Sequence, residues 1–74
     1  MKTIEDVLRD VIKDPVDVIF AVNNYKVNGR IILQEEAYVE PVEHALLLAG
    51  YFVSKRDKRG EFTHLYVDEQ IRYR

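Results

Sequence analysis

Residues 41–67 have the sequence PVEHALLLAGYFVSKRDKRGEFTHLYV, in which an apolar helical pattern runs into a charged β-hairpin. The pair Glu40-Pro41 predicts a helix start, because proline suits the first helical position. Gly50 fits the left-handed position that ends such a helix, so we expect a helix over 41–49. Its predicted buried stripe consists of Val42, Ala45, Leu46 and Ala49, widened by Leu47 and Leu48.

The hairpin is predicted from its turn residues. Asp57 and Gly60 occupy the first and last positions of a type I turn, and a bulge at the glycine then gives a three-residue loop. In this register Arg56 lies opposite Phe62. The expected core face contains Tyr51, Val53, Lys55, Thr63, Leu65 and Val67. The expected opposite face contains Phe52, Ser54, Arg56, Phe62, His64 and Tyr66.

Two helices are predicted in the N-terminal half. The first covers 3–13, where Thr3 is a good N-cap. Its apolar stripe is Ile4, Val7, Leu8, Val11 and Ile12. Asp14 and Pro15 begin a second helix over 15–26, whose cap signals favour helix although its many β-branched residues favour strand. Its expected helical face contains Val16, Ile19, Phe20 and Asn23, with Val18 and Val22 behind it.

Asn28-Gly29 is the strongest turn signal in the chain and leaves two topologies open. In the first, this pair ends the second helix and a short strand follows near 30–33. In the second, the pair closes a hairpin, and the element order becomes α-α-β-β-α-β-β. Residues 34–38 favour helix by propensity but span barely more than one turn.

Residues 45–53, the charged segment 54–60 and residues 62–67 together resemble the end of a winged helix-turn-helix domain. In that superfamily, which includes MarR-like and PadR-like regulators, a recognition helix leads through a Leu-x-x-x-Gly-Tyr corner into a charged hairpin, the wing. Residues 29–37 resemble the short strand and second helix that precede the recognition helix. The resemblance covers 29–74 and implies an α+β, winged-helix-like fold.

The expected organisation is a single domain over 1–74, because the chain is short. It consists of an extra N-terminal helix in 1–14, a winged-helix-like core over 15–67 and a C-terminal tail at 68–74. The wing strands are predicted at 51–57 and 61–67. The chain has no cysteine, and no uninterrupted apolar run is longer than that at 45–49, whereas a membrane span needs about 20 residues. We therefore expect a cytoplasmic protein with no membrane partner.

Catalysis and metal binding find little support in the sequence. The single serine, Ser54, has no neighbouring base and no glycine elbow. The carboxylate pairs at 35–36 and 68–69 consist of adjacent residues, which point apart on a regular element. Glu40 and His44 have a spacing that suits a metal, but two ligands do not make a site. We expect a non-enzymatic protein with no catalytic residue, no metal and no cofactor.

Two binding functions remain open. In the first, the wing residues Lys55, Arg56, Lys58 and Arg59 contact phosphates of double-stranded DNA, with His44 near the groove, as in a transcription regulator. In the second, an adaptor or inhibitor binds a protein partner through Phe52, Phe62, His64 and Tyr66. Residues 1–50 carry a net charge of −4 and residues 51–74 a net charge of +2, which permits only a local basic contact. A homodimer that pairs through the first helix is expected in either case.

Overall fold

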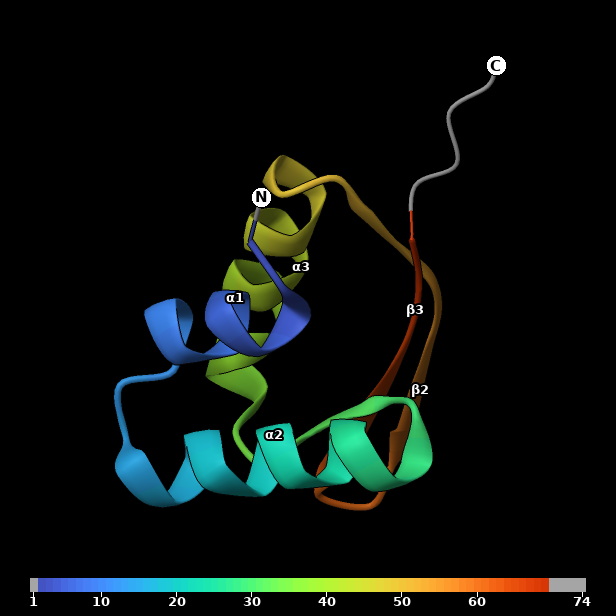
Figure 1. The fold of residues 1–74 in the computed structure, drawn as a ribbon. Helices are drawn as coiled ribbons and strands as arrows, with labels where there is room; N and C mark the ends of the chain where they lie inside the picture. Colours follow the sequence, from blue (N-terminus) through green and yellow to red (C-terminus); the bar gives the residue numbers. More distant parts are fainter. Residues whose placement is uncertain (1, 70–74) are drawn as a thin grey trace.

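The computed structural model describes residues 2–69, in which the first and third helices lie on one face of a three-stranded antiparallel sheet and the second helix packs against the short first strand (Figure 1). The sheet order is β1-β3-β2, so the last strand is central. The expected α+β, winged-helix-like fold is confirmed. In chain order the elements are α1 (Ile4–Val11), α2 (Pro15–Asn28), β1 (Ile31–Leu33), the 3₁₀ turn η1 (Glu36–Tyr38), α3 (Val39–Leu48), β2 (Tyr51–Arg59) and β3 (Phe62–Glu69).

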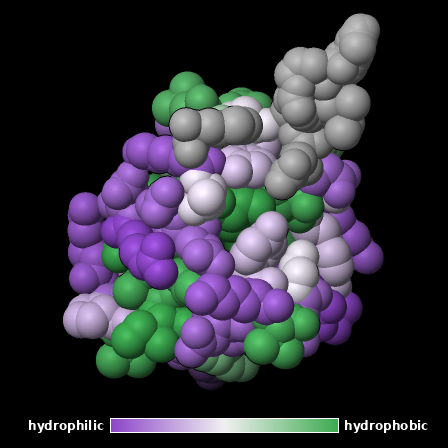
Figure 2. All heavy atoms as spheres, viewed as in Figure 1, coloured by the Kyte–Doolittle hydropathy of each residue, from purple (hydrophilic) through white to green (hydrophobic). Residues whose placement is uncertain are grey.

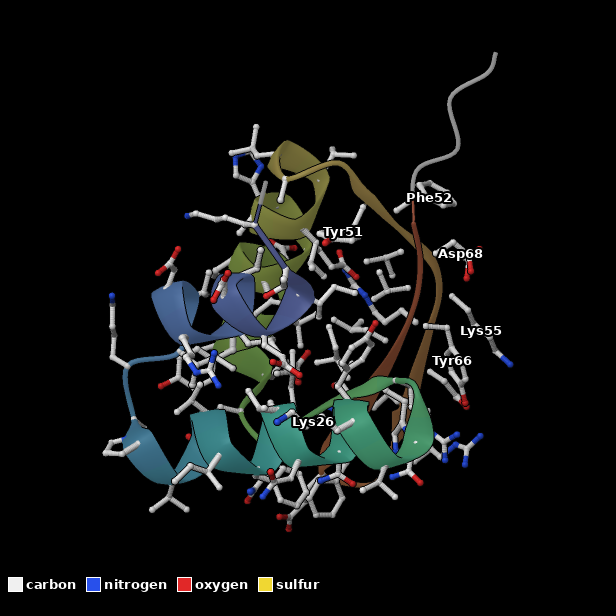
Figure 3. The ribbon with its side chains drawn as sticks, viewed as in Figure 1. Lys26, Tyr51, Phe52, Lys55, Tyr66 and Asp68 are labelled. Atoms are coloured by element: carbon white, nitrogen blue, oxygen red, sulfur yellow. The ribbon has the colours of Figure 1, made fainter. Side chains whose placement is uncertain are left out.

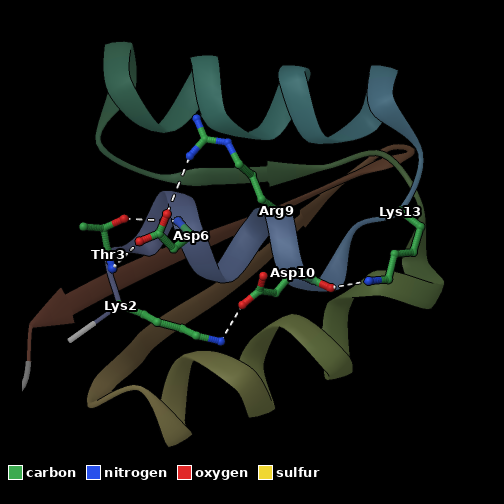
Figure 4. A network of polar contacts seen from close by, with 6 residues as sticks. All are labelled: Lys2, Thr3, Asp6, Arg9, Asp10 and Lys13. Atoms are coloured by element: carbon green, nitrogen blue, oxygen red, sulfur yellow. Dashed lines mark hydrogen bonds and ion pairs between the residues drawn. The ribbon is translucent and has the colours of Figure 1, made fainter.

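The first two helices begin at the residues whose side chains predicted their starts. The Thr3 hydroxyl accepts a hydrogen bond of 3.1 Å from the Asp6 N–H, and the Asp6 carboxylate accepts one of 3.4 Å from the Thr3 N–H (Figure 4). This reciprocal capping box satisfies two backbone donors at the start of α1. Asp14 caps α2 by accepting hydrogen bonds from the next two free N–H groups, those of Val16 and Asp17, at 2.9 and 3.2 Å.

The helical face expected on α2 is not the face that is buried. Ala21 and Val22 are buried, whereas Val16 and Ile19 point into solvent. The helix is apolar around most of its circumference, so its periodicity does not identify one inward side. The packing of β1 and α1 against α2 selects the side that contains Val18, Ala21, Val22 and Tyr25.

Gly29 decides between the two topologies that the sequence leaves open. It caps the C-terminus of α2 in the left-handed conformation, with φ +76, and its N–H donates to the Tyr25 carbonyl at 2.9 Å. The hairpin alternative at Asn28-Gly29 is therefore wrong. The strand that follows, β1, pairs instead with β3, where Ile31 lies opposite Leu65.

The core lies between α1, α3 and the sheet. Leu8, Ile31, Leu46 and Leu65 are fully buried in it. The helix α3 starts at Val39, two residues before the expected start, because η1 leads directly into it. Pro41 is tolerated there because the N–H groups of the first helical turn have no intrahelical acceptor. Leu47 and Leu48, expected to widen the buried stripe, are exposed.

The predicted register of the hairpin is wrong by three residues. Arg56 pairs with Leu65 and Arg59 with Phe62, so the loop contains two residues, Gly60 and Glu61. Gly60 has φ +63, which is typical of the first loop position in a type II′ turn. The tight loop lets the ladder continue through Arg59, a longer pairing than the predicted three-residue loop permits.

A β-bulge at Ser54 changes which side chains face the helices. The pairing shifts between Val53 and Lys55, and the Ser54 hydroxyl donates to the Tyr66 carbonyl at 3.1 Å. An unpaired extra residue reverses the alternation of the strand beyond it. Lys55 therefore lies opposite Tyr66 on the face away from α3, and Arg56 lies on the helix side, the reverse of the prediction for both residues.

The C-terminal boundary also differs from the expected tail at 68–74. Asp68 and Glu69 belong to β3, and the remainder of the predicted tail, 70–74, lies outside the described residues. Within residues 2–69, no helix combines the length and the apolar character that crossing a membrane requires.

Candidate functional site

The face of the sheet that points away from α1 and α3, here called the outer face, brings together aromatic and charged side chains. Tyr66, Lys55, Phe52 and Asp68 all project from the hairpin on this side, while Tyr51 points toward the helices (Figure 3). By the strand register the outer face contains Phe52, Lys55, Asp57 and Arg59 from β2, and Phe62, His64, Tyr66 and Asp68 from β3.

The four residues predicted to bind a partner protein share the outer face, but their surroundings differ. Phe52 is 54% exposed at one end of the hairpin, opposite Asp68. Phe62, at the other end, stacks on Phe20 of α2 with a centroid distance of 5.9 Å. His64 and Tyr66 lie between them and are half-buried.

Two cations lie against the ring of Tyr66 in the middle of this face. The guanidinium carbon of Arg30 is 5.6 Å from the ring centroid, and Nζ of Lys55 is 5.4 Å from it. Both distances are within the range of a cation–π interaction. We call Arg30, Lys55, His64 and Tyr66 the outer-face cluster. The bulge at Ser54 places Lys55 in it, and the pairing of β1 with β3 places Arg30 in it.

His64 accepts a hydrogen bond within the cluster. The Arg30 Nε–H donates to His64 Nδ1 at 3.2 Å, which requires that this nitrogen carry no proton. Burial lowers the pKa of His64, and the positive charges of Arg59 and Arg30 lower it further. A neutral His64 therefore orients the Arg30 side chain toward Tyr66.

Arg56 and Lys58, predicted as phosphate contacts, lie on the helix side of β2 and pair with carboxylates there. Arg56 donates two hydrogen bonds to Glu43 of α3, at 2.6 and 2.9 Å, and Lys58 lies 2.5 Å from Glu36 of η1. The hydrogen bond from Lys58 lowers the pKa of Glu36. We call these contacts the wing–helix ion pairs.

The wing–helix ion pairs border a groove of about 620 Å³ between the start of α3 and the wing. A helix-turn-helix protein presents its recognition helix to DNA at the corresponding place. Glu36, Glu40, Arg56 and Lys58 all line this groove, so acidic and basic groups alternate in it. The structure thus divides the predicted basic cluster between two sides of the sheet.

The remaining predicted contacts are separated as well. Arg59 lies on the outer face and pairs with Asp57 at 2.8 Å. His44 is exposed on α3 and shares a shallow surface depression with Glu40, Glu43, Leu47 and Arg56. Within residues 2–69, no group of three histidine, cysteine or acidic side chains is arranged to hold a metal ion.

Arg30 is the member of the outer-face cluster that the sequence did not predict. It lies 34 positions from His64 in the chain, and the short strand that follows it gives no sign of its pairing partner. No local sequence pattern connects the two positions, because the contact depends on the antiparallel pairing of β1 with β3.

The chain was compared with models of protein families, with curated proteins and with solved structures, and none of the three comparisons gave a match. The distinguishing feature of the surface is the environment of its cations. Of the nine lysine and arginine residues within 2–69, six form ion pairs with carboxylates, whereas Lys13, Arg30 and Lys55 do not.

Proposed function

We propose that the protein is a small, non-enzymatic, nucleic-acid-binding module of the transcription-regulator type, which holds phosphates with the outer face of its wing. The observation behind this proposal is the position of Arg30 and Lys55, which lie on one exposed face beside Tyr66 without a carboxylate partner. A cation with no internal counterion is free to bind phosphate and release the counterions condensed on the nucleic acid.

The helix side of the wing suits phosphate binding less well. Arg56 and Lys58 are already paired with Glu43 and Glu36. The exposed Glu40 adds a further negative charge near the start of α3, where a recognition helix meets its groove. We therefore place the contact on the outer face, in contrast to the docking of a helix-turn-helix protein through its recognition helix.

Two lysines of β2 test this placement, because they belong to the same strand and project from opposite faces. We expect Lys55→Ala to weaken binding to a fluorescent oligonucleotide and to reduce the slope of log K against log salt by about 0.7 to 0.9. Lys58→Ala is the matched control and should change the slope little, because Glu36 already neutralises this lysine. Equal losses in the two variants, or no salt-dependent binding by the native protein, would contradict the proposal.

A second candidate function, a protein-interaction module, is favoured by an exposed apolar band on α2. Val16, Ile19 and Val27 are 69%, 60% and 81% exposed, and Figure 2 shows hydrophobic residues along the lower edge of the molecule, where α2 lies. The fourth member of this face, Asn23, is uncharged. A second copy of the chain is the partner that we propose for the band. Antiparallel pairing of two such helices brings Val16 near Val27 of the other copy and introduces no charge into the contact.

A further inference from the structure

We infer that the outer-face cluster binds single-stranded nucleic acid, with a base stacked at Tyr66 and the flanking phosphates held by Arg30 and Lys55. This inference rests on the proposed function and names the class of nucleic acid. It differs from the expectation of double-stranded DNA at α3 and the wing tip.

The aromatic side chains of β3 are arranged as a platform. Phe62, His64 and Tyr66 occupy every second position of the central strand and share the outer face. Alternate residues of an antiparallel strand lie about 6.8 Å apart along the strand. Phe52 extends the aromatic surface beyond Tyr66 and is 54% exposed. Phe62 already stacks on Phe20, so Tyr66 and Phe52 are the rings that this surface offers to unpaired bases.

Arg30 and Lys55 lie over the ring of Tyr66, so a base that stacks on this ring displaces one of them toward the phosphates beside it. Arg30 reaches Tyr66 from the position just before β1, and Lys55 reaches it from β2, so the ring in the central strand has a positive charge on the side of each neighbouring strand. Figure 3 shows Lys55 and Tyr66 projecting together into solvent. A guanidinium can also stack on a base, because it is planar.

The same geometry disfavours a duplex. Bases within a duplex are stacked on both faces, so their rings cannot reach a side chain on a flat sheet. Sequence reading of duplex DNA relies on an element that enters a groove. The helix that would do so, α3, carries the exposed Glu40 in its first turn, which would meet the phosphates with like charge.

An acidic protein segment is the competing ligand of this face. Its carboxylates would pair with Arg30 and Lys55, but they would gain nothing specific from an aromatic ring at position 66. The requirement for the ring therefore separates the two ligands. Tyr66→Phe retains the ring, whereas Tyr66→Leu removes it at similar volume, and the position is only half-buried.

The test is fluorescence anisotropy at low ionic strength with a labelled oligothymidine of about 12 nucleotides, a length within the range of known single-strand sites. A duplex of the same length and polyglutamate are the other two ligands. We expect the single strand to bind most tightly and Tyr66→Leu to weaken that binding about 5- to 150-fold, the loss of one stacked base. Tyr66→Phe should bind like the native protein. Lys13→Ala, which removes a third cation without an ion pair but far from the cluster in sequence, should also have no effect.

Each alternative outcome has a distinct meaning. Absence of binding to both nucleic acids would overturn the proposed function together with this inference. Equal or tighter binding of the duplex, unaffected by Tyr66→Leu, would overturn the inference and leave the proposed function standing. Tighter binding of polyglutamate than of the single strand would replace nucleic acid with an acidic protein partner. The urea midpoints of the Tyr66 variants should match that of the native protein, which shows that a loss of binding is not a loss of folding.

Discussion

Single residues with similar chemistry have very different surroundings in this small protein. Leu46 and Leu47 are neighbours in the same helix, yet Leu46 is fully buried against the core and Leu47 is 61% exposed. His44 and His64 differ in the same way, since one is exposed on α3 and the other accepts a hydrogen bond from Arg30. Their substitutions should therefore have separable effects on stability and on its dependence on pH.

We expect Leu46→Ala to lower the free energy of unfolding by about 2 to 5 kcal/mol, because it removes buried methyl groups and leaves a cavity. Leu47→Ala is the matched control and should change it by less than about 0.5 kcal/mol, because an exposed side chain loses few contacts. Urea titration measures both values. Similar losses in the two variants would mean that α3 presents a different side to the core.

His64 should make stability fall as the pH decreases below about 6.5, the ordinary pKa of histidine. Its pKa is lowered in the folded protein, so the unfolded chain binds the proton more readily there, and acid favours unfolding. His64→Gln should remove this part of the pH dependence between the two pKa values. The difference between native and variant urea midpoints across pH 5 to 8 measures it without the carboxylate contributions. A constant difference over that range would contradict the assignment.

Among the elements, the wing departs most from its predicted geometry. The two-residue loop and the bulge at Ser54 act together: the loop sets the register, and the bulge turns Lys55 toward the outer face. β2 is also an edge strand of the sheet, and charged side chains and a bulge are features that discourage pairing with another strand. The basic residues of the wing therefore have a structural role in addition to the proposed binding role.

Two substitutions distinguish the observed hairpin from the predicted one. Gly60→Ala should destabilise the protein by about 1 to 2 kcal/mol, because alanine is strained at φ +63 although no atom lies within 4 Å of the added Cβ. Asp57→Thr should be tolerated, because Asp57 pairs with His64 within the strand and does not open the turn. Urea titration provides both values. Strong destabilisation by Asp57→Thr would support the three-residue loop instead.

On the scale of the whole molecule, charge and apolar surface are distributed unevenly. Nine of the thirteen carboxylates belong to residues 1–50. The net charge of the whole chain is therefore −2, whereas residues 51–74, which include the wing, have a net charge of +2. The apolar side of α1 is buried within the chain, with Ile4, Val7, Leu8 and Ile12 in the core. Of the apolar stripe of the first helix, Val11 alone is half-buried and the rest is buried, so little apolar surface remains there for the expected dimer contact. The proposed contact uses the band on α2 instead.

We expect sedimentation equilibrium at micromolar concentration to show a two-fold dimer that depends on this band. Ile19→Glu introduces a charge near its centre and should yield a monomer of 8.7 kDa. Leu47→Glu adds the same charge at an exposed leucine of α3 and should leave the dimer intact. A native protein that sediments as a monomer would contradict the second candidate function and leave the nucleic-acid proposal unaffected.

Local sequence signals were sufficient to predict the helix ends, because these depend on interactions between residues that are close in the chain. The caps at Thr3 and Asp14 and the left-handed conformation at Gly50 all agree with their predicted positions. These features depend on hydrogen bonds and steric limits within a few residues, which a single sequence contains. The sequence also predicted one shared face for Phe52, Phe62, His64 and Tyr66. Side chains alternate between the two faces of a strand, so the three residues of β3, which are two positions apart, lie on the same face.

Features that depend on contacts between distant segments required the folded structure. The inward side of α2 is chosen by its neighbours, since the helix itself is apolar on most sides. The hairpin register depends on the pairing of β2 with β3, which continues as far as Arg59 and Phe62. The bulge at Ser54 then places Lys55 and Arg56 on the faces opposite to those predicted. Arg30 reaches Tyr66 only because β1 pairs with β3 across more than 30 residues of chain. The periodicity of a sequence indicates which residues share one side of a helix or strand. It does not indicate which other element covers that side, because packing between elements decides this. In this protein, packing places Arg30 and Lys55, which have no carboxylate partner within residues 2–69, beside the ring of Tyr66.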